Sequence, residues 1–446
     1  MNLHFLLPKK PIASYAEYLK TFKGRPPISI AKEMAPDEIV GELLASGLRG
    51  RGGAGFPTGR KWAAVRGHAC RARTVLCNAA EGEPATFKDR FLLRMNPYAP
   101  IEGMIAAARV VETDRLFIAA KKSFRKELGR LRNALEEMRG AGALDGLSIQ
   151  IVEGPEEYLF GEEKALLEVV EGKGPLPREA HYPPYQWGLN ATLQSPNPAL
   201  VNNVETFARV PGILRHGAAS FRKLGTPDTP GPVIFTVCGD VRRPGVYERE
   251  AGIRLRDLFE TVAGGPRRGR SFKAALPGVS AAVLPEDRFG TPAEFGALAG
   301  IGSGLGAAGF WVLDDSTSMA RVALAVARFL FVESCNQCTA CKAGLREAWE
   351  SLDALFRGDG PLDRRIEEMV YGAKSAPQGN RCYLPVQGSK LLPSLVERFR
   401  GEFERLEGAP VAIPKIADAD ERGGAFTYDP MQERKLPDWT YAEKKA

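Results

Sequence analysis

The sequence predicts a multidomain α/β protein with a helical C-terminal part. A chain of 446 residues is too long for one simple core, so roughly two to four domains are expected. Strand-like and helix-like segments alternate between residues 73 and 152, which is typical of a parallel sheet covered by helices. A linker rich in glycine and proline follows at residues 225–232, and the pattern becomes helical from Met319 onward.

The composition excludes several classes of protein. The apolar fraction of 44% and the charged fraction of 26% are those of an ordinary soluble globular protein. Apolar runs such as residues 322–332 are shorter than the ~18–20 residues that span a bilayer, so no membrane span is expected. The net charge of +7 comes from interspersed Lys and Arg rather than from basic clusters with aromatics, which argues against nucleic-acid binding.

The N-terminus and the cysteine content indicate a cytoplasmic protein. The start, MNLHFLLPKKP, has the wrong order of apolar and charged residues for a signal peptide. The seven cysteines are therefore expected to be reduced thiols or metal ligands rather than disulfides.

A glycine-rich loop at residues 47–62, GLRGRGGAGFPTGRKW, follows a lead-in (residues 1–35) and an expected helix at residues 36–45. Glycines allow close backbone approach, and N–H groups with nearby cations can cradle phosphate oxygens. The loop satisfies G-x-G-x-x-G, but a helix precedes it and Pro57 interrupts the segment after it, unlike the dinucleotide fingerprint. We interpret it as a nucleotide-type loop of a non-Rossmann kind; the alternative is a flexible surface loop.

The first expected strand, residues 73–78, leads into an acidic turn at residues 79–90, AAEGEPATFKDR. Ligands of open α/β sheets bind beyond the carboxyl ends of strands, so Asn78, Glu81 and Glu83 are expected to face the glycine loop. A solvated acidic turn is the alternative interpretation.

Further strands are expected at residues 115–120 and 147–152, before a turn and helix that start at Tyr158. Glu162 and Glu163 lie in the first turn of that helix, where carboxylates suit the helix dipole. After a long loop, the adjacent Asn202 and Asn203 can donate to and accept from a ring system or ribose, although asparagine is also a common helix cap.

The segment after the linker predicts a β-grasp domain. Two strands, at residues 233–239 and 245–248, form a hairpin-like pair, and a helix follows at residues 255–263. This order suits a small ubiquitin-like module that ends near Leu313. Cys238 lies on an apolar strand and is expected in the core.

The C-terminal helices carry a cysteine motif. Cys335, Cys338 and Cys341 have the spacing C-x2-C-x2-C, and Cys382 supplies a remote fourth thiolate. Three closely spaced thiolates and a fourth suit a [4Fe–4S] cluster, which we favour over a tetrahedral zinc site. Cys70 and Cys77 are expected to be structural, and the Pro-rich tail from Gly408 a docking arm or disordered.

Together these segments resemble one family. Over about residues 15–410 the chain resembles the flavin-carrying, NADH-oxidising subunit of respiratory complex I and its relatives in NAD-linked hydrogenases and formate dehydrogenases. The resemblance is carried by six segments: GLRGRGGAGFPTGRKW, CNAAEGEPATFKDR, YLFGEEKAL, VNNVETFARVPG, GDVRRPGVYE and ESCNQCTACKAG.

The resemblance implies FMN, a [4Fe–4S] cluster and NAD. It implies a Rossmann-like but non-classical FMN/NADH-binding α/β domain at residues 36–224, a soluble-ligand-binding β-grasp domain at 233–313, an iron–sulfur helical bundle at 319–407 and a tail at 408–446. The implied cofactor contacts are Gly50, Arg51, Gly52, Gly53, Phe56, Lys61, Asn78, Glu81, Tyr158, Gly161, Glu162, Glu163, Asn202 and Asn203. Glu81, Glu83 and Glu163 are the implied catalytic residues, and Cys335, Cys338, Cys341 and Cys382 the cluster ligands.

The implied activity is transfer of hydride from NADH to FMN, followed by single-electron transfer through the cluster to a partner. The expected partners are a thioredoxin-like iron–sulfur subunit and a further iron–sulfur subunit of a larger complex. Through them the chain would lie at the periphery of the inner membrane.

Several residues depart from the family pattern near the donor site. They are Ala64, Ala80, Ala85, Phe160, Lys164 and the segment PREAHYPPYQWG, in which Tyr185 stands at the usual Phe position. Loss of a stacking ring and of a charged group predicts weakened NADH binding. One alternative is therefore a flavin–cluster relay fed by another redox partner. An alternative of another class is a zinc-binding scaffold.

Overall fold

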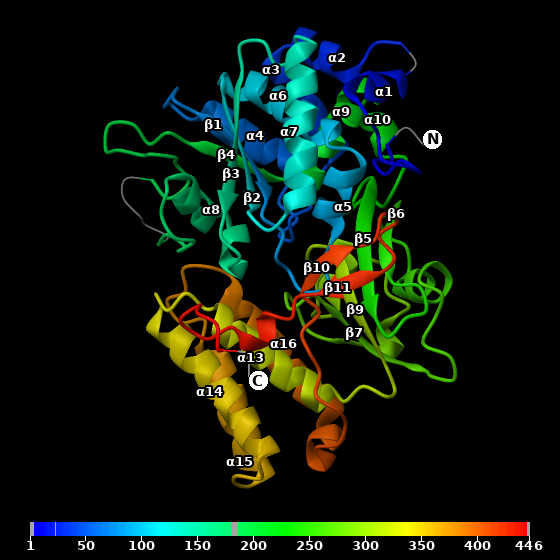
Figure 1. Cartoon of the computed structure of the whole chain (residues 1–446), viewed down its shortest axis with the longest axis vertical. Helices are drawn as coiled ribbons and strands as arrows, with labels where there is room; N and C mark the ends of the chain where they lie inside the picture. Colours follow the sequence, from blue (N-terminus) through cyan, green and yellow to red (C-terminus); the bar gives the residue numbers. More distant parts are fainter. Residues whose placement is uncertain (1–3, 23, 180–184, 444–446) are drawn as a thin grey trace.

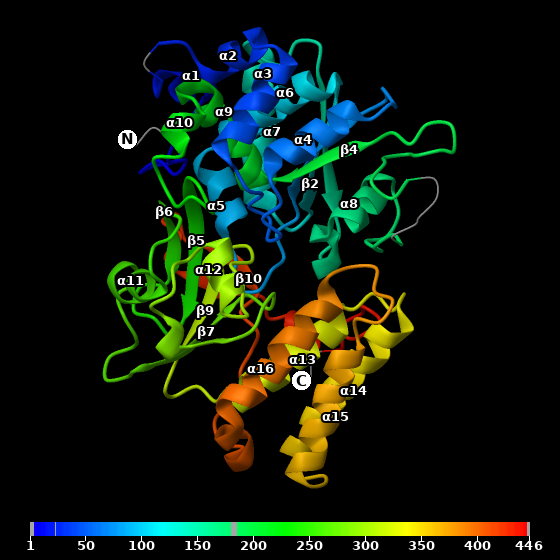
Figure 2. The ribbon, with the colours of Figure 1, turned by 180° about the vertical axis from the view of Figure 1, so that it is seen from behind.

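The computed structural model describes residues 4–22, 24–179 and 185–443. An α/β domain, a second sheet and a group of long helices meet around the centre of the molecule (Figure 1; Figure 2 shows the opposite side). The mixed α/β multidomain fold predicted from the sequence is confirmed at this level.

The α/β domain contains a four-stranded sheet with the order β3-β2-β1-β4, and all its strand pairs are parallel. β1 is apolar and buried along most of its length, as is typical of an interior parallel strand. The strands are β1 (Thr74–Ala79), β2 (Arg115–Lys121), β3 (Ser148–Gly154) and β4 (Ala199–Asn203).

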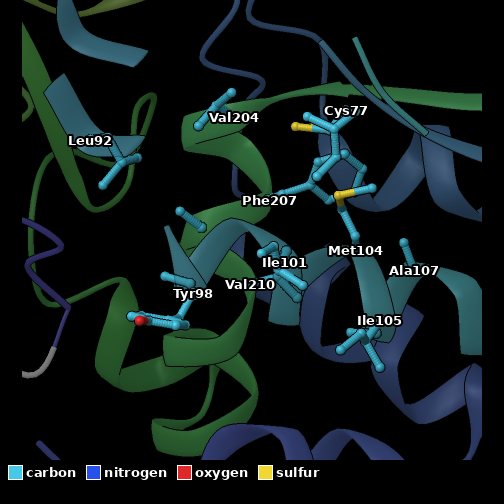
Figure 3. Packing of buried hydrophobic residues seen from close by; sticks show 14 of the residues in the cluster. Cys77, Leu92, Tyr98, Ile101, Met104, Ile105, Ala107, Val204, Phe207 and Val210 are labelled. Carbon is cyan, nitrogen blue, oxygen red and sulfur yellow. The ribbon is translucent and has the colours of Figure 1, made fainter. Parts of the chain in front are cut away.

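Helices pack tightly around this sheet. Gly103 on α6 lies so close to α9 that an added Cβ would be 2.0 Å from the Phe207 carbonyl oxygen, and Figure 3 shows the surrounding apolar side chains. The helices of this domain are α3 (Pro36–Ser46), α4 (Thr58–Gly67), α5 (Lys88–Met95), α6 (Tyr98–Val111), α7 (Arg125–Gly140), α8 (Glu163–Val170), α9 (Val204–His216) and α10 (Ala218–Phe221), with a 3-10 turn at Tyr158–Gly161.

The N-terminal segment, expected as a lead-in, is packed into the core of this domain. It forms α1 (Tyr15–Lys20) and α2 (Pro27–Glu33), and Tyr15 and Tyr18 are buried. The Tyr18 hydroxyl donates to the buried Glu102 carboxylate at 2.8 Å. Burial of these rings explains why the segment adheres to the domain.

The second sheet has the order β6-β5-β9-β7-β8. β5 and β9 are parallel and the other pairs antiparallel, and Cys238 is fully buried on β5, as predicted. The elements are β5 (Pro232–Gly239), β6 (Gly245–Glu250), α11 (Leu255–Asp257) with a π turn at Leu258–Val262, β7 (Phe272–Pro277), β8 (Leu284–Pro285), a 3-10 turn at Glu286–Arg288, α12 (Phe295–Gly300) and β9 (Gly309–Asp314).

The C-terminal helices share a continuous apolar core. Gly344 and Gly372 face each other across α14 and α15, where an added Cβ would come within 2.4 and 2.6 Å of the opposite carbonyl oxygen. The helices are α13 (Met319–Glu333), α14 (Thr339–Phe356), α15 (Leu362–Ser375) and α16 (Leu384–Arg405). No helix among the described residues has the length and apolar character needed to cross a membrane.

The described part of the tail, residues 408–443, is ordered, which argues against disorder, one of the two alternatives expected for it. It forms the antiparallel pair β10 (Ile416–Ala419) and β11 (Phe426–Tyr428) and a 3-10 turn at Gln432–Arg434. The Lys435 ammonium is buried and donates to both carboxylate oxygens of Glu333 on α13, at 2.9 and 2.8 Å. Arg94 on α5 donates to the Ala419 carbonyl at 2.9 Å. The tail therefore connects the helical part to the α/β domain.

Candidate functional site

A cavity of about 690 Å³, called the large cavity below, lies where the three parts of the chain meet. The glycine loop and the acidic turn, with the ends of β1 and β4 and the start of α8, form one side of it. Of the residues predicted from the sequence, it is lined by Gly50, Gly52, Gly53, Phe56, Lys61, Asn78, Glu81, Glu83, Tyr158, Gly161, Glu162, Glu163, Asn202 and Asn203.

Arg51 is the exception among the predicted site residues. Its side chain is buried outside the lining of the large cavity and donates to the carbonyls of Pro230 and Pro232, at 2.8 and 3.2 Å. Its backbone N–H donates to the Thr206 hydroxyl at 2.8 Å. The guanidinium therefore anchors the glycine loop to the linker before β5, because a buried guanidinium needs acceptors that the linker carbonyls provide.

The glycine loop has the backbone conformation that its composition predicts. Gly53 and Gly55 have φ values of 124° and 62°, a region that residues with a Cβ rarely adopt. A Cβ on Gly52 would lie 3.3 Å from the Asn203 Cβ, so the loop is packed closely against the end of β4. Exposed N–H groups in such a loop can bind phosphate.

Lys61 follows the loop on α4 and faces the large cavity. Its ammonium donates to both carboxylate oxygens of Glu163 at 3.0 Å and to the Val201 carbonyl at 3.1 Å. The next residue, Trp62, donates its indole N–H to Asn202 at 2.8 Å. α4 thus holds a cation and an amide in fixed orientations at the cavity wall.

The three predicted asparagines meet at one edge of the sheet. The parallel register of β1 and β4 places Asn78 beside Asn203. Asn78 donates to the Gly161 carbonyl at 2.8 Å, and Asn203 donates to Asp89 at 2.5 Å. Asn203 also caps α9 by accepting from the Glu205 N–H at 3.0 Å, so this residue both caps a helix and lines the large cavity.

Three partly buried carboxyl groups line the large cavity with pKa values above their usual range. Burial raises the pKa of Glu81, Glu83 and Glu162 to about 7 in each case. Glu83 accepts from the Tyr158 hydroxyl at 2.5 Å and from the Val279 N–H at 2.8 Å. These groups can therefore hold or release a proton near neutral pH.

Two further walls of the large cavity were missed from the sequence. The part that contains the second sheet contributes Ser280, Ala281, Phe295, Ala299 and residues 303–307, and α16 with the residue before it contributes Tyr383, Leu384, Gln387 and Lys390 next to the predicted Cys382. The run GSGLGAAG at residues 302–309 was the available signal for the first wall. The apolar pattern of α16 gave none, because it also suits an ordinary bundle helix.

The four predicted cysteines line a second, small cavity, called the cysteine site below. Leu159, Ser334, Asn380, Arg381, Leu384 and Pro385 complete its wall. All four thiols are free, and burial raises the pKa of Cys341 to about 11. Cys77 and Cys238 lie outside this wall, in the cores of the two sheets, while Cys70 contacts Ser195 and Asn197.

The cysteine site fits an iron–sulfur cluster. Four thiolates around one cavity are the donor set of [4Fe–4S]. Within the described part of the chain, no three His, Cys, Asp or Glu side chains lie close enough to share one metal ion. In a cluster each cysteine binds a separate iron.

The two cavities adjoin each other. Leu159, Cys382 and Leu384 line both of them. Cys382 thus lies between the nucleotide-type loop region and the other three thiols.

The residues that depart from the family pattern have clear structural places. Ala85 adopts a φ of 61°, where the family commonly has glycine, and its Cβ is buried. The ring of Phe160 is fully buried against Gly154, whose added Cβ would lie 2.2 Å from it. Residues 180–184 of the segment PREAHYPPYQWG lie outside the described residues.

Family models match the regions that form these sites. A model described as the Nuo51 FMN-binding domain matches residues 43–212, and one described as the NADH-ubiquinone oxidoreductase-F iron-sulfur binding region matches residues 321–406. A model of the SLBB domain matches residues 234–276.

Relatives match over most of their length. The NADH-quinone oxidoreductase F 2 subunit of Rhizobium meliloti (strain 1021) is 38% identical over 380 residues, covering 83% of this chain and 89% of the relative. The NADH-quinone oxidoreductase F subunit of Aquifex aeolicus (strain VF5) is 33% identical over 424 residues, covering 93% and 96%. A chain of the NAD+-reducing [NiFe]-hydrogenase in its H2-reduced state matches with a TM-score of 0.77 and 32% identity, covering 89% of this chain and 67% of that chain.

The family models confirm the FMN, NADH and [4Fe–4S] assignments, and the relatives confirm the resemblance. This chain belongs to the family of NADH-quinone oxidoreductase F subunits, the FMN- and iron–sulfur-containing electron-transfer subunits of multisubunit oxidoreductases.

Proposed function

We propose that this chain oxidises NADH at an FMN in the large cavity and passes the electrons singly to a [4Fe–4S] cluster in the cysteine site. The observation that carries this proposal is the wall shared by the two cavities, formed by Leu159, Cys382 and Leu384. FMN supplies the chemistry that connects a two-electron hydride donor to a one-electron acceptor.

In this proposal the glycine loop and the strand ends hold the flavin. The backbone around Gly52 and Gly53, together with Lys61, binds the phosphate. Asn78, Asn202 and Asn203 bind the polar edge of the ring or ribose. Hydrogen bonds from the Trp62 indole and from the first turn of α9 fix the orientation of Asn202 and Asn203.

The acidic residues act beside the reacting atoms. Glu81 and Glu83, with pKa values near 7, hold or release a proton at their carboxylate oxygens as the charge in the cavity changes. Glu163 is held by Lys61 and so positions that cation at the cavity wall.

We expect reduced affinity for NADH, because two residues that could replace the usual donor contacts lie outside the wall of the large cavity. The Tyr185 ring faces His68 at 5.4 Å and the Arg178 side chain donates to Glu171 at 2.7 Å, and neither residue lines the large cavity. Phe56 and Tyr383, which are 53% and 52% exposed, are aromatic side chains available in the cavity wall. These placements keep a second candidate open, a flavin–cluster relay fed by another redox partner.

Anaerobic titration with NADH tests the proposal. We expect flavin bleaching that saturates between roughly ten micromolar and one millimolar NADH, in the upper part of the usual range of substrate affinities. Phe56→Ala should weaken the apparent affinity about 2- to 13-fold, the equivalent of one stacking ring. Saturation at a few micromolar would show an intact donor pocket, and no bleaching at millimolar NADH would favour the relay.

We also propose where each function lies in the chain and which subunits the chain contacts. We place FMN and NADH binding in residues 36–224, the β-grasp domain in 233–313 and the cluster bundle in 319–407, with the tail at 408–446. The partners we propose are a thioredoxin-like iron–sulfur subunit and a further iron–sulfur subunit, through which the chain lies in the cytoplasm at the membrane periphery. Flavin and iron analysis of the purified protein separates this from the zinc-scaffold alternative.

A further inference from the structure

Lys164 connects α8 to the cysteine site. It is the second residue of α8, which lies on the side of the α/β domain that faces the C-terminal helices (Figure 1). Its side chain is only 7% exposed, and its ammonium donates to the Arg381 carbonyl at 2.6 Å. That carbonyl belongs to the peptide bond that joins Arg381 to Cys382, so a positive charge lies one peptide group from a cluster ligand.

Other contacts hold this ammonium in place. The Trp187 ring lies 5.7 Å from it, in a cation–π arrangement. The Arg381 guanidinium pairs with Glu179, a largely exposed side chain, at 2.5 Å. Lys164 therefore contributes a buried positive charge beside Cys382, whereas Lys342 lies beside Cys335 and donates to the Ser334 carbonyl at 2.9 Å, and the charge of Arg381 is partly balanced at the surface.

A partly buried carboxyl group lies in the same place. The Glu162 carboxylate caps α8 and accepts from the N–H groups of Lys164 and Ala165, at 2.9 and 2.8 Å. It is close enough to Cys382 to interact electrostatically with that thiol. A carboxylate here disfavours the addition of an electron to the cysteine site, and Lys164 has the opposite effect.

We propose that Lys164 is a positioning residue that raises the reduction potential of the cluster in the cysteine site. The inference rests on the proposed function, because it takes the four cysteines as cluster ligands. One-electron reduction adds a negative charge to a group that is already anionic. A nearby ammonium shielded from water stabilises that reduced form, because charge interactions are stronger in a medium of low dielectric constant. The hydrogen bond to the Arg381 carbonyl also orients the peptide group that carries Cys382.

The test is an EPR-monitored redox titration of the full-length protein with dithionite. Lys164→Gln and Lys164→Met should each disfavour cluster reduction at least about tenfold, a lowering of the midpoint potential by about 59 mV for one electron. Lys164→Arg keeps the charge and should retain most of the potential. Lys173→Gln is the matched control: this lysine is half exposed and paired with Glu171, so the potential should not change.

The outcomes separate this inference from the proposed function. No cluster signal in the unmodified protein would contradict the cysteine assignment itself. An unmodified-protein signal with equal midpoint potentials in the Gln and Met variants would overturn the role of Lys164. Loss of the cluster from both neutral variants would show that Lys164 only maintains the Arg381–Cys382 segment, and would also overturn it.

Discussion

The large cavity and the cysteine site differ in how much of the chain they need. The wall of the large cavity runs from Arg49 to Lys390 and takes residues from all three parts of the molecule. Three of the four cysteines, by contrast, lie within residues 335–341. A site whose residues lie close together in the sequence can therefore be predicted from the sequence. A site between domains depends instead on how the surfaces of those domains meet.

The two regions also differ in the pKa values of their carboxyl groups. In the large cavity, burial raises the pKa of Glu83 to about 7. Beneath the cysteine site, burial alone would raise the pKa of Glu333, but Lys415 and Lys435 lower it to about 2. The cavity thus keeps carboxyl groups that can change protonation near neutral pH, and the bundle fixes a permanent ion pair.

The strongest test of the comparison is Cys382→Ala, because Cys382 lines both cavities. Removal of one of four thiolates should abolish the EPR signal of the reduced cluster while the flavin absorbance remains. Cys70→Ala serves as the control and should leave both signals in place. An unaltered cluster signal in Cys382→Ala would mean that the fourth ligand lies elsewhere.

Gly53→Val tests the large cavity. A β-branched residue is strained at a φ of 124°, so the loop should lose its phosphate-binding conformation and release most of the FMN. The cluster should remain, since the bundle does not depend on this loop. Gly41→Ala, at a position where an added Cβ meets nothing within 4 Å, is the control. Stoichiometric flavin in Gly53→Val would contradict the placement of the loop.

Lys435→Met tests whether the tail stabilises the bundle. It leaves the Glu333 carboxylate, which is 0% exposed, without its closest cation, and should cost about 3–5 kcal/mol of stability. Thermal unfolding measures the loss, which the added change Glu333→Gln should partly restore. Lys126→Met removes an exposed ion pair to Asp418 and should cost less than about 1 kcal/mol. Equal unfolding temperatures for the Lys435 and Lys126 variants would show that the tail contributes little.

The smallest expected effect is a change in pH dependence. Because the pKa of Glu83 is raised to about 7, the folded protein binds more protons than the unfolded chain between pH 4.5 and 7, so stability falls as pH rises through that range. Glu83→Gln should make this fall in the free energy of unfolding smaller by on the order of 3 kcal/mol. Unfolding temperatures of the two proteins measured from pH 4.5 to 8 check it. Parallel pH profiles would show that the pKa of Glu83 is the same in the folded and unfolded states.

Local sequence determined much of the fold and of the site chemistry. Alternation of strand-like and helix-like segments predicted the strands from β1 to β3, and β1, which lies inside the sheet, is apolar and buried along most of its length. The glycines at 53 and 55 predicted a loop with positive φ, and it has that conformation. The spacing of Cys335, Cys338 and Cys341 predicted a shared site, and all three line the cysteine site.

Only the tertiary structure decided which distant segments of the chain lie next to these elements. It brought Cys382 to the other cysteines, placed Phe295 and residues 303–307 on the cavity wall, and turned the Arg51 side chain toward the linker carbonyls. It also ordered the described part of the tail, where Lys435 donates to the buried Glu333. The mixed charge of the tail could not predict this contact. The physical reason is common to all four: local periodicity fixes the conformation of a segment, but burial of apolar faces and pairing of buried charges between segments far apart in the chain decide what each segment faces.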